Sequence, residues 1–250
     1  MSNWRETLGL WRSLLMYYGV PGRFARMKKF YGQFIGPDDL CFDIGAHVGN
    51  RLRVWQALGA RMVAVEPQPA LLRCLRRFFG ADPRVTLVAQ AIGAAEGMAT
   101  LHISTRTPTV TTLSTQWMHD VKRDASFRKV EWDEEVVVPV TTLDVLIARH
   151  GVPAFCKIDV EGFELEVLRG LTQPLQALSF EYIPASIEVA LGCIDRLEQL
   201  GRYQYNYSPG ETHRLQQTQW LDADAMRNVL RGIRHGSGDV YARLSPLRLG

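Results

Sequence analysis

The sequence predicts an α/β protein with one doubly wound, mostly parallel seven-stranded sheet, an antiparallel edge and an N-terminal helical extension. Short apolar runs recur along the chain, helical stretches separate them, and a glycine turn follows the first run. Continuous apolar runs of this length are typical of strands buried on both faces of a parallel sheet. The chain has 250 residues, 46% of them hydrophobic. It is therefore long and apolar enough to bury such a sheet.

The predicted extension covers residues 1–36, and residues 37–250 form the main domain. Large apolar residues recur in the extension at steps of four and three, which places them on one stripe of a helix: Trp4, Leu8, Trp11, Leu15 and Tyr18. A basic and aromatic segment, 23–31, follows. We expect the stripe to pack on the main domain. The alternative is a helix that touches an anionic membrane surface or covers the substrate, because tryptophans beside arginines suit an interface.

From residue 40 the elements follow in a regular order. Strands are predicted over 40–44, 62–65, 85–89, 154–160 and 177–183. Helices are predicted over 51–58, 69–79, 142–150, 163–168 and 194–200. Two regions interrupt the alternation. Residues 97–140 are expected to hold extra strands and a mobile loop, and residues 203–244 a strand, a helix and a final strand that form the antiparallel edge.

Composition narrows the class of function. The formal charge is +3, from 29 basic and 26 acidic residues, and the first 31 residues alone carry +5. The rest is slightly acidic, so no nucleic-acid partner is expected. The four cysteines lack the close spacing of a zinc site and the density of a disulfide scaffold. With no apolar run near ~18 residues and no signal-peptide core, we expect reduced thiols and a cytoplasmic protein.

The glycine turn after the first strand indicates a nucleoside site. A dinucleotide turn has three spaced glycines, whereas only Gly45 and Gly49 are present here. A cofactor without pyrophosphate, S-adenosylmethionine, fits better, with Asp43 near its ammonium and Glu66 on its ribose diol. The spacing from Asp43 to Glu66 also fits a dinucleotide site. A nicotinamide-dependent oxidoreductase and a non-catalytic nucleoside-binding module therefore remain alternatives.

Several blocks of the chain together resemble a known family. They are Asp43-Ile-Gly-Ala-His-Val-Gly-Asn50, Glu66-Pro67, Gln90-Ala-Ile-Gly93, Lys157-Ile-Asp-Val-Glu-Gly-Phe-Glu164, Leu168-Arg-Gly170 and Phe180-Glu181. The chain resembles the FkbM family of S-adenosylmethionine-dependent methyltransferases, although that family usually has Asn where this chain has His47. The resemblance implies a class I methyltransferase-like sheet in residues 37–250. It also implies O-methylation of a small-molecule hydroxyl, on a sugar, glycoconjugate or other secondary metabolite.

Two groups of site residues follow. The expected cofactor-binding residues lie at the ends of the first three strands: Asp43, Gly45, Ala46, His47, Gly49, Asn50, Glu66, Gln90 and Ala91. The expected catalytic residues lie at the ends of the central strand and its neighbour: Asp159, Lys157, Glu161 and Glu181. If the strand persists, Lys157, Asp159 and Glu161 share one face, and the alternative for them is a buried structural ion pair. Carboxylates would suit Mg²⁺, but we expect no metal.

Overall fold

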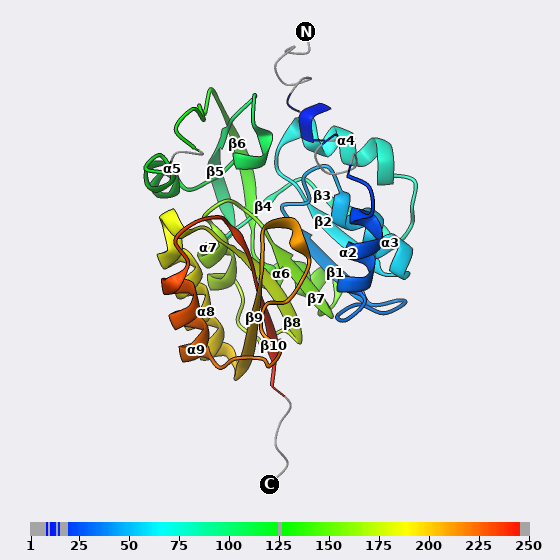
Figure 1. The fold of residues 1–250 in the computed structure, drawn as a ribbon. Helices are drawn as coiled ribbons and strands as arrows, with labels where there is room; N and C mark the ends of the chain where they lie inside the picture. The colour runs from blue at the N-terminus through cyan, green and yellow to red at the C-terminus, as the bar shows by residue number, and fades with distance from the viewer. Residues whose placement is uncertain (1–8, 10, 14, 16–19, 125–126, 246–250) are drawn as a thin grey trace.

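The computed structural model describes residues 9, 11–13, 15, 20–124 and 127–245. Its main feature is a seven-stranded sheet (Figure 1). The strands lie in the order β3 (Val85–Val88), β2 (Arg61–Val65), β1 (Leu40–Ile44), β7 (Phe155–Ile158), β8 (Ala177–Tyr182), β10 (Gly238–Leu244) and β9 (Tyr203–Pro209). β10 runs antiparallel to both β8 and β9, and the other pairs are parallel. The predicted doubly wound sheet with an antiparallel edge is confirmed.

The order of the strands places a ligand site between β1 and β7. The chain runs outward from β1 to β3 and then returns to the other side of β1, so β1 and β7 mark the point where the strand order reverses. At such a point the two connections leave in opposite directions and open a crevice beyond the carboxyl ends of the strands. Asp43 and Lys157 are direct neighbours in this pair of strands.

Helices cover both faces of the sheet (Figure 1). Along β1 and β2, alternate side chains enter one of two hydrophobic clusters, as the pleat requires. The cluster on one face includes residues of α2 (Arg23–Tyr31), α3 (Asn50–Leu58) and α4 (Pro69–Phe79). The cluster on the other face includes residues of α6 (Leu143–His150), α7 (Glu164–Arg169), α8 (Ile187–Leu200) and α9 (Ala223–Gly232).

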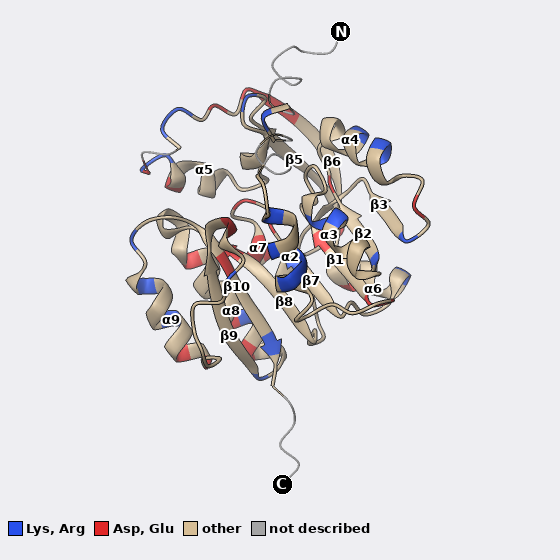
Figure 2. Ribbon diagram, turned by 45° about the vertical axis from the view of Figure 1, so that its right-hand side comes forward, with Lys and Arg blue, Asp and Glu red and all other residues tan. Residues whose placement is uncertain are grey.

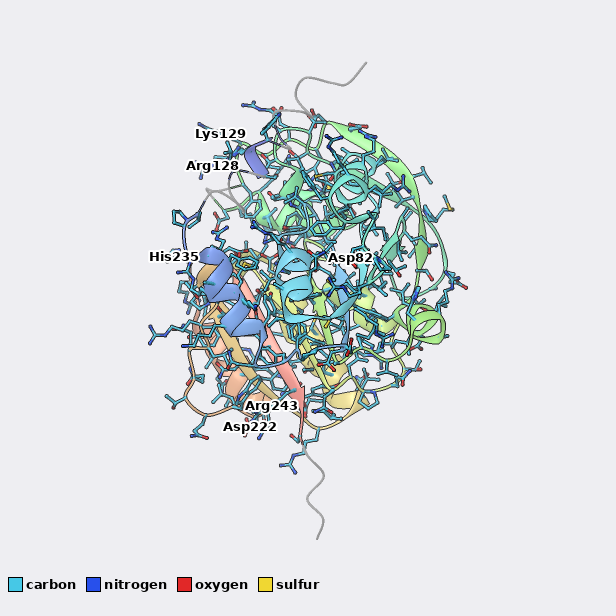
Figure 3. All side chains as sticks on the ribbon, turned by 90° about the vertical axis from the view of Figure 1, so that its right-hand side faces the viewer. Asp82, Arg128, Lys129, Asp222, His235 and Arg243 are labelled. Atoms are coloured by element: carbon cyan, nitrogen blue, oxygen red, sulfur yellow. The ribbon has the colours of Figure 1, made fainter. Side chains whose placement is uncertain are left out.

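The region between β3 and α6 forms a second, three-stranded sheet. Its order is β4 (Ala91–Ile92), β6 (Glu134–Thr141) and β5 (Gly97–Ile103). The expected extra strands are therefore confirmed. The segment between β5 and β6 contains a short 3-10 helix, Pro108–Val110, and the helix α5 (Thr115–Val121). Its basic residues Arg128 and Lys129 lie at the edge of the molecule (Figure 3), whereas Pro108 and Val110 are buried.

Two predicted boundaries differ from the structure by two residues or more. β7 ends at Ile158, two residues before the predicted end of the strand, because the chain turns sharply after Asp159. The helix predicted to start at residue 194 already begins at Ile187. Its first turns hold Ile187, Val189 and Gly192, which are poor helix formers, so propensity places the start too late. Contacts of α8 with α7 and α9 compensate.

The N-terminal helix α2 belongs to the core. Met27, Phe30 and Tyr31 are buried, and the Tyr31 ring meets Trp55 and Phe155 edge-on. The division of the chain after residue 36 stays a prediction. What the structure shows is that α2, which precedes residue 36, shares a hydrophobic cluster with the sheet.

The predicted apolar stripe precedes α2 in the sequence. Trp4, Leu8 and Tyr18 lie outside the described residues. Trp11 and Leu15 are described and are 60% and 67% exposed, so neither packs on the main domain as expected. The backbone at Gly9 instead lies close to the segment after β5, since a Cβ there would be 2.5 Å from the Thr105 carbonyl oxygen. No helix among the described residues is long and apolar enough to cross a membrane.

Candidate functional site

An open cavity of about 710 Å³ lies at the carboxyl ends of β1, β2 and β7. One wall is apolar and includes Leu71, Ala91, Ile92 and Leu101, and the segment 108–113 covers another side. The cavity thus lies where the strand order predicts a ligand.

The glycine turn brings β1 against the neighbouring strands. Gly45 has φ +85°, and a Cβ at this position would lie 1.9 Å from the carbonyl oxygen of Asp159. The backbone N–H groups of Gly45 and Ala46 both donate to the Val65 carbonyl at 3.0 Å. Only glycine allows this conformation and this approach, so the turn is built into the edge of the sheet.

Glu66 is held in place by backbone N–H groups on both sides. His47 N donates to its Oε2 and Gln68 N to its Oε1, each at 2.9 Å. Burial raises the pKa of Glu66 to about 7, although these two hydrogen bonds oppose the shift. The carboxylate lines the cavity and keeps lone pairs for further donors. It is therefore a preorganised acceptor for a pair of hydroxyls.

Two other polar residues of the turn region are buried without hydrogen-bond partners among the described residues. Both carboxylate oxygens of Asp43 lack a donor, and Nδ2 of Asn50 lacks an acceptor. Asp43 is fully buried, and this burial raises its pKa to about 6. Buried polar groups rarely stay unpaired, so each indicates a missing ligand or water. An ammonium and a carboxylate, the two ends of an amino acid, would satisfy this acceptor and this donor.

Only some of the predicted cofactor-binding residues line the cavity. His47 lines the cavity, and burial lowers the pKa of its ring to about 4, so the imidazole is neutral at physiological pH. Ala91 lines the cavity as well. Five of the predicted residues are not among the described residues that line it: Asp43, Ala46, Gly49, Asn50 and Gln90. Gln68, which the sequence analysis missed, does line it.

Asp159 lies in a buried network of charges. Arg51 Nη2 is 2.6 Å and Lys157 Nζ 3.4 Å from its Oδ2, and Lys157 Nζ is 2.6 Å from Asp239 Oδ1. Burial opposes ionisation of Asp159, but Lys157 and Arg51 lower its pKa to about 2. Lys157 itself is fully buried and is not among the described residues lining the cavity. The buried ion pair that the sequence left as an alternative is therefore present.

Glu161 and Glu181 join Asp159 in a cluster of carboxylates. One oxygen of each lies within 4.8 Å of the others, close enough to hold a metal ion. The strand does not persist as the prediction required, since Glu161 has φ +53°, and a turn rather than a strand brings Glu161 to Asp159. Burial and the neighbouring carboxylates raise the pKa values of Glu161 and Glu181 well above the usual range. Glu181 borders a smaller pocket beside Trp117.

Sequence reasoning missed the partners that complete this cluster. Arg51 is 6% exposed and extends from α3, directly after the cofactor turn, and Asp239 comes from the antiparallel edge. The position of Arg51 just after the glycine turn could have indicated it. Asp239 had no local signal, because only the pairing of β10 with β8 places it opposite Glu181.

The sheet, its antiparallel edge and the cavity at its switch point define a class I methyltransferase-like protein. The model of the methyltransferase FkbM domain matches residues 43–207, which is more than half of the chain. The chain therefore belongs to the FkbM methyltransferase family, and its cofactor is S-adenosylmethionine. Of the two enzyme classes that the sequence left open, this match favours the methyltransferase.

Comparison with solved structures finds similar chains at low sequence identity. Precorrin-6y C5,15-methyltransferase of Geobacter metallireducens GS-15 has a TM-score of 0.46 and 13% identity over 89% of this chain and 87% of its own. Fibrillarin of Aeropyrum pernix has a TM-score of 0.43 and 11% identity over 84% of this chain and 68% of its own. An S-adenosylmethionine-dependent O-methyltransferase of Thermotoga maritima has a TM-score of 0.39 and 12% identity over 92% of this chain and 67% of its own. No curated protein sequence matches this chain.

Proposed function

We propose that this chain transfers the methyl group of S-adenosylmethionine to a hydroxyl of a small molecule, a sugar, glycoconjugate or other secondary metabolite. The observation that carries the proposal is a single cavity that places Glu66 on one wall and Asp159 and Glu161 on another. When bound, the cofactor supplies an electrophilic methyl group. The protein then has two tasks, to hold the acceptor oxygen in line and to remove its proton. Positioning contributes up to ~7 to 11 kcal/mol, more than a base usually does.

On the cofactor side, we assign each end of the molecule to residues of the turn region. Glu66 accepts hydrogen bonds from the ribose diol, because its two oxygens are fixed and face the cavity. Asp43 accepts from the ammonium and Asn50 donates to the carboxylate, which satisfies their unpaired atoms. The adenine packs on the apolar wall around Ala91, and Gln90 is left as an outer partner for its amine.

On the acceptor side, the three carboxylates have different roles. Arg51 and Lys157 keep Asp159 ionised, so it is a weak base and a good hydrogen-bond acceptor that orients the hydroxyl. Glu161 and Glu181 have raised pKa values, so each of them, when ionised, is a stronger base than Asp159. The acceptor oxygen gains the methyl group, and its proton passes to one of these two carboxylates.

We propose that the transfer needs no metal ion, although the three carboxylates have the spacing to hold one. Arg51 and Lys157 already bring two positive charges to Asp159. A divalent cation would compete with both for the same carboxylate.

The experiment that tests the function follows an isotopically labelled methyl group. The full chain is incubated with labelled S-adenosylmethionine and fractionated extract, and mass spectrometry locates the label. An ether-linked methyl on a sugar or other small metabolite is expected. A label on nitrogen, carbon or a carboxylate would contradict O-methylation. The variant Glu66→Gln, run in parallel at the same cofactor concentration, should transfer less.

We also propose that the protein acts in the cytoplasm and touches membranes peripherally. Its four cysteines are free buried thiols, which suits a reducing compartment. Trp11 and Leu15 are exposed beside the exposed Arg12, a combination that suits an anionic lipid surface. Flotation with vesicles of phosphatidylserine and phosphatidylcholine tests the contact. The double variant Trp11→Ser/Leu15→Ser should stay unbound, and equal binding by both proteins would contradict the proposal.

A further inference from the structure

Two adjacent threonines connect opposite walls of the cavity. Thr111 and Thr112 follow the short helix after β5, and both line the cavity. Thr111 Oγ1 donates to Gln68 Oε1 at 3.0 Å, on the cofactor side. Thr112 Oγ1 donates to the carbonyl oxygen of Glu161 at 2.6 Å, on the acceptor side. One short segment thus holds both halves of the site through two separate hydroxyls.

The residue that Thr112 holds has an unusual backbone. Glu161 has φ +53°, in the left-handed region that residues with a Cβ rarely adopt. Such a conformation persists only where its surroundings enforce it, and it occurs preferentially at functional sites. This conformation is what turns the Glu161 side chain toward Asp159 and Glu181 after β7 has ended.

The two residues beside Glu161 have contacts of their own. Gly162 has φ +86°, and a Cβ there would lie 2.1 Å from Cδ1 of Trp117, so the α5 indole packs directly on this turn. The N–H groups of Val160 and Gly162 both donate to Glu164 Oε1, at 3.1 and 3.2 Å. These contacts hold the two neighbours of Glu161. The hydroxyl of Thr112 is the contact made to the Glu161 carbonyl itself.

Thr112 is itself rigidly placed. It is 1% exposed, and its backbone exchanges hydrogen bonds of 2.9 and 3.1 Å with His102 of β5. Its Oγ1 also accepts from Ser114 N at 2.9 Å, which leaves the hydroxyl proton directed to Glu161. A side chain anchored in this way can transmit the position of the second sheet to the carboxylate.

We propose that Thr112 is a positioning residue for methyl transfer: its hydroxyl keeps Glu161 in the left-handed turn that directs the carboxylate to the acceptor oxygen. Thr111 has the corresponding role for the cofactor, since Gln68 N in turn donates to Glu66. The inference rests on the proposed function, in which Glu161 acts on the acceptor. It adds that the segment after β5 sets the geometry of cofactor binding and of the carboxylate that acts on the acceptor.

The test compares two isosteric substitutions at neighbouring positions. Thr112→Val should lower kcat ~10- to 100-fold, the usual cost of misplacing a reacting group, with little change in the Kd for S-adenosylhomocysteine. Thr112→Ser, which restores the hydroxyl, should recover most of the rate. Thr111→Val should instead weaken S-adenosylhomocysteine binding by about 3- to 10-fold, the range for one hydrogen bond. Thr100→Val, at an exposed position of β5, is the matched control and should keep wild-type turnover.

Calorimetric binding of S-adenosylhomocysteine shows that each variant is folded, and Thr112→Ala replaces Thr112→Val if the latter is not. Wild-type kcat in a folded variant without the hydroxyl, or failure of Thr112→Ser to recover the rate, would overturn the positioning role. Glu161→Gln separates this failure from that of the proposed function. If Glu161→Gln keeps full turnover, the role of Glu161 is wrong and the inference falls with it. If Glu161→Gln is slow while Thr112→Val is not, only the inference is wrong.

Discussion

Replacing Glu66 by glutamine tests the ribose site directly. Each oxygen of Glu66 already accepts a backbone N–H at 2.9 Å, from His47 and from Gln68. Glutamine keeps the shape but turns one acceptor into an NH₂ group, which then faces one of these donors. It also removes the negative charge that the ribose hydroxyls would meet. Hydrogen bonds to a charged group are worth about 1.5 to 3 kcal/mol, so the Kd for S-adenosylhomocysteine should rise about 10- to 150-fold.

Calorimetric titration at pH 8.5 measures this change, because Glu66, with a pKa of about 7, is ionised there. Glu188→Gln, at an exposed position of α8, is the matched control and should bind as the wild type does. A Kd within about twofold of wild type in folded Glu66→Gln would refute the assignment, since loss of the hydrogen bonds from the ribose hydroxyls should change the Kd by several-fold more.

The same assay has a pH dependence of known sign. Burial raises the pKa of Glu66, so in the free protein the carboxyl takes up a proton as the pH falls through about 7. The ribose hydroxyls donate and therefore favour the ionised form. Affinity for S-adenosylhomocysteine should be constant above pH 8 and weaken below pH 7, by up to ~10-fold per pH unit. Glu66→Gln should flatten this dependence below pH 7, and an unchanged slope would assign it to another group.

Three further predictions concern other parts of the site. Asp159→Asn leaves Arg51 without its buried counter-charge, whereas Lys157 keeps Asp239, so denaturant titration should show a loss of about 3 to 5 kcal/mol of unfolding free energy; unchanged stability would mean that the network is not buried in solution. Gly45→Ala introduces a Cβ 1.9 Å from the Asp159 carbonyl oxygen at φ +85° and should abolish S-adenosylhomocysteine binding; retained affinity would show that the turn does not form the site. Dialysis against EDTA should leave kcat unchanged, whereas a loss that Mg²⁺ restores would establish a metal at the carboxylates.

Most of the fold could be predicted because its signals are local. The apolar runs of β1 and β2 and the helix α4 lie within a residue of their predicted bounds, since strands buried on both faces and an amphipathic helix that begins at a proline are visible in a single window. The antiparallel edge followed from two late strands with a helix between them. The early start of α8 could not be predicted from the sequence, because packing against α7 and α9 overrides the low helix propensity of its first turns.

The candidate site was predictable where it follows a turn and not where it depends on the whole fold. Glu66 and Gly45 were indicated by their places at strand ends, and both line the cavity. The cluster of Asp159, Glu161 and Glu181 was expected too, but the predicted cause was wrong. A left-handed turn, and not a continued strand, brings Glu161 to Asp159. Arg51 reaches Asp159 across 108 positions of sequence, and no local pattern encodes that distance.

A crystal structure with bound S-adenosylhomocysteine is the most direct measurement of the central claim. We predict both ribose hydroxyls within hydrogen-bond distance of the Glu66 carboxylate and the sulfur facing Asp159 and Glu161. A nucleoside bound away from the turn at Gly45, or a ribose that does not touch Glu66, would contradict it.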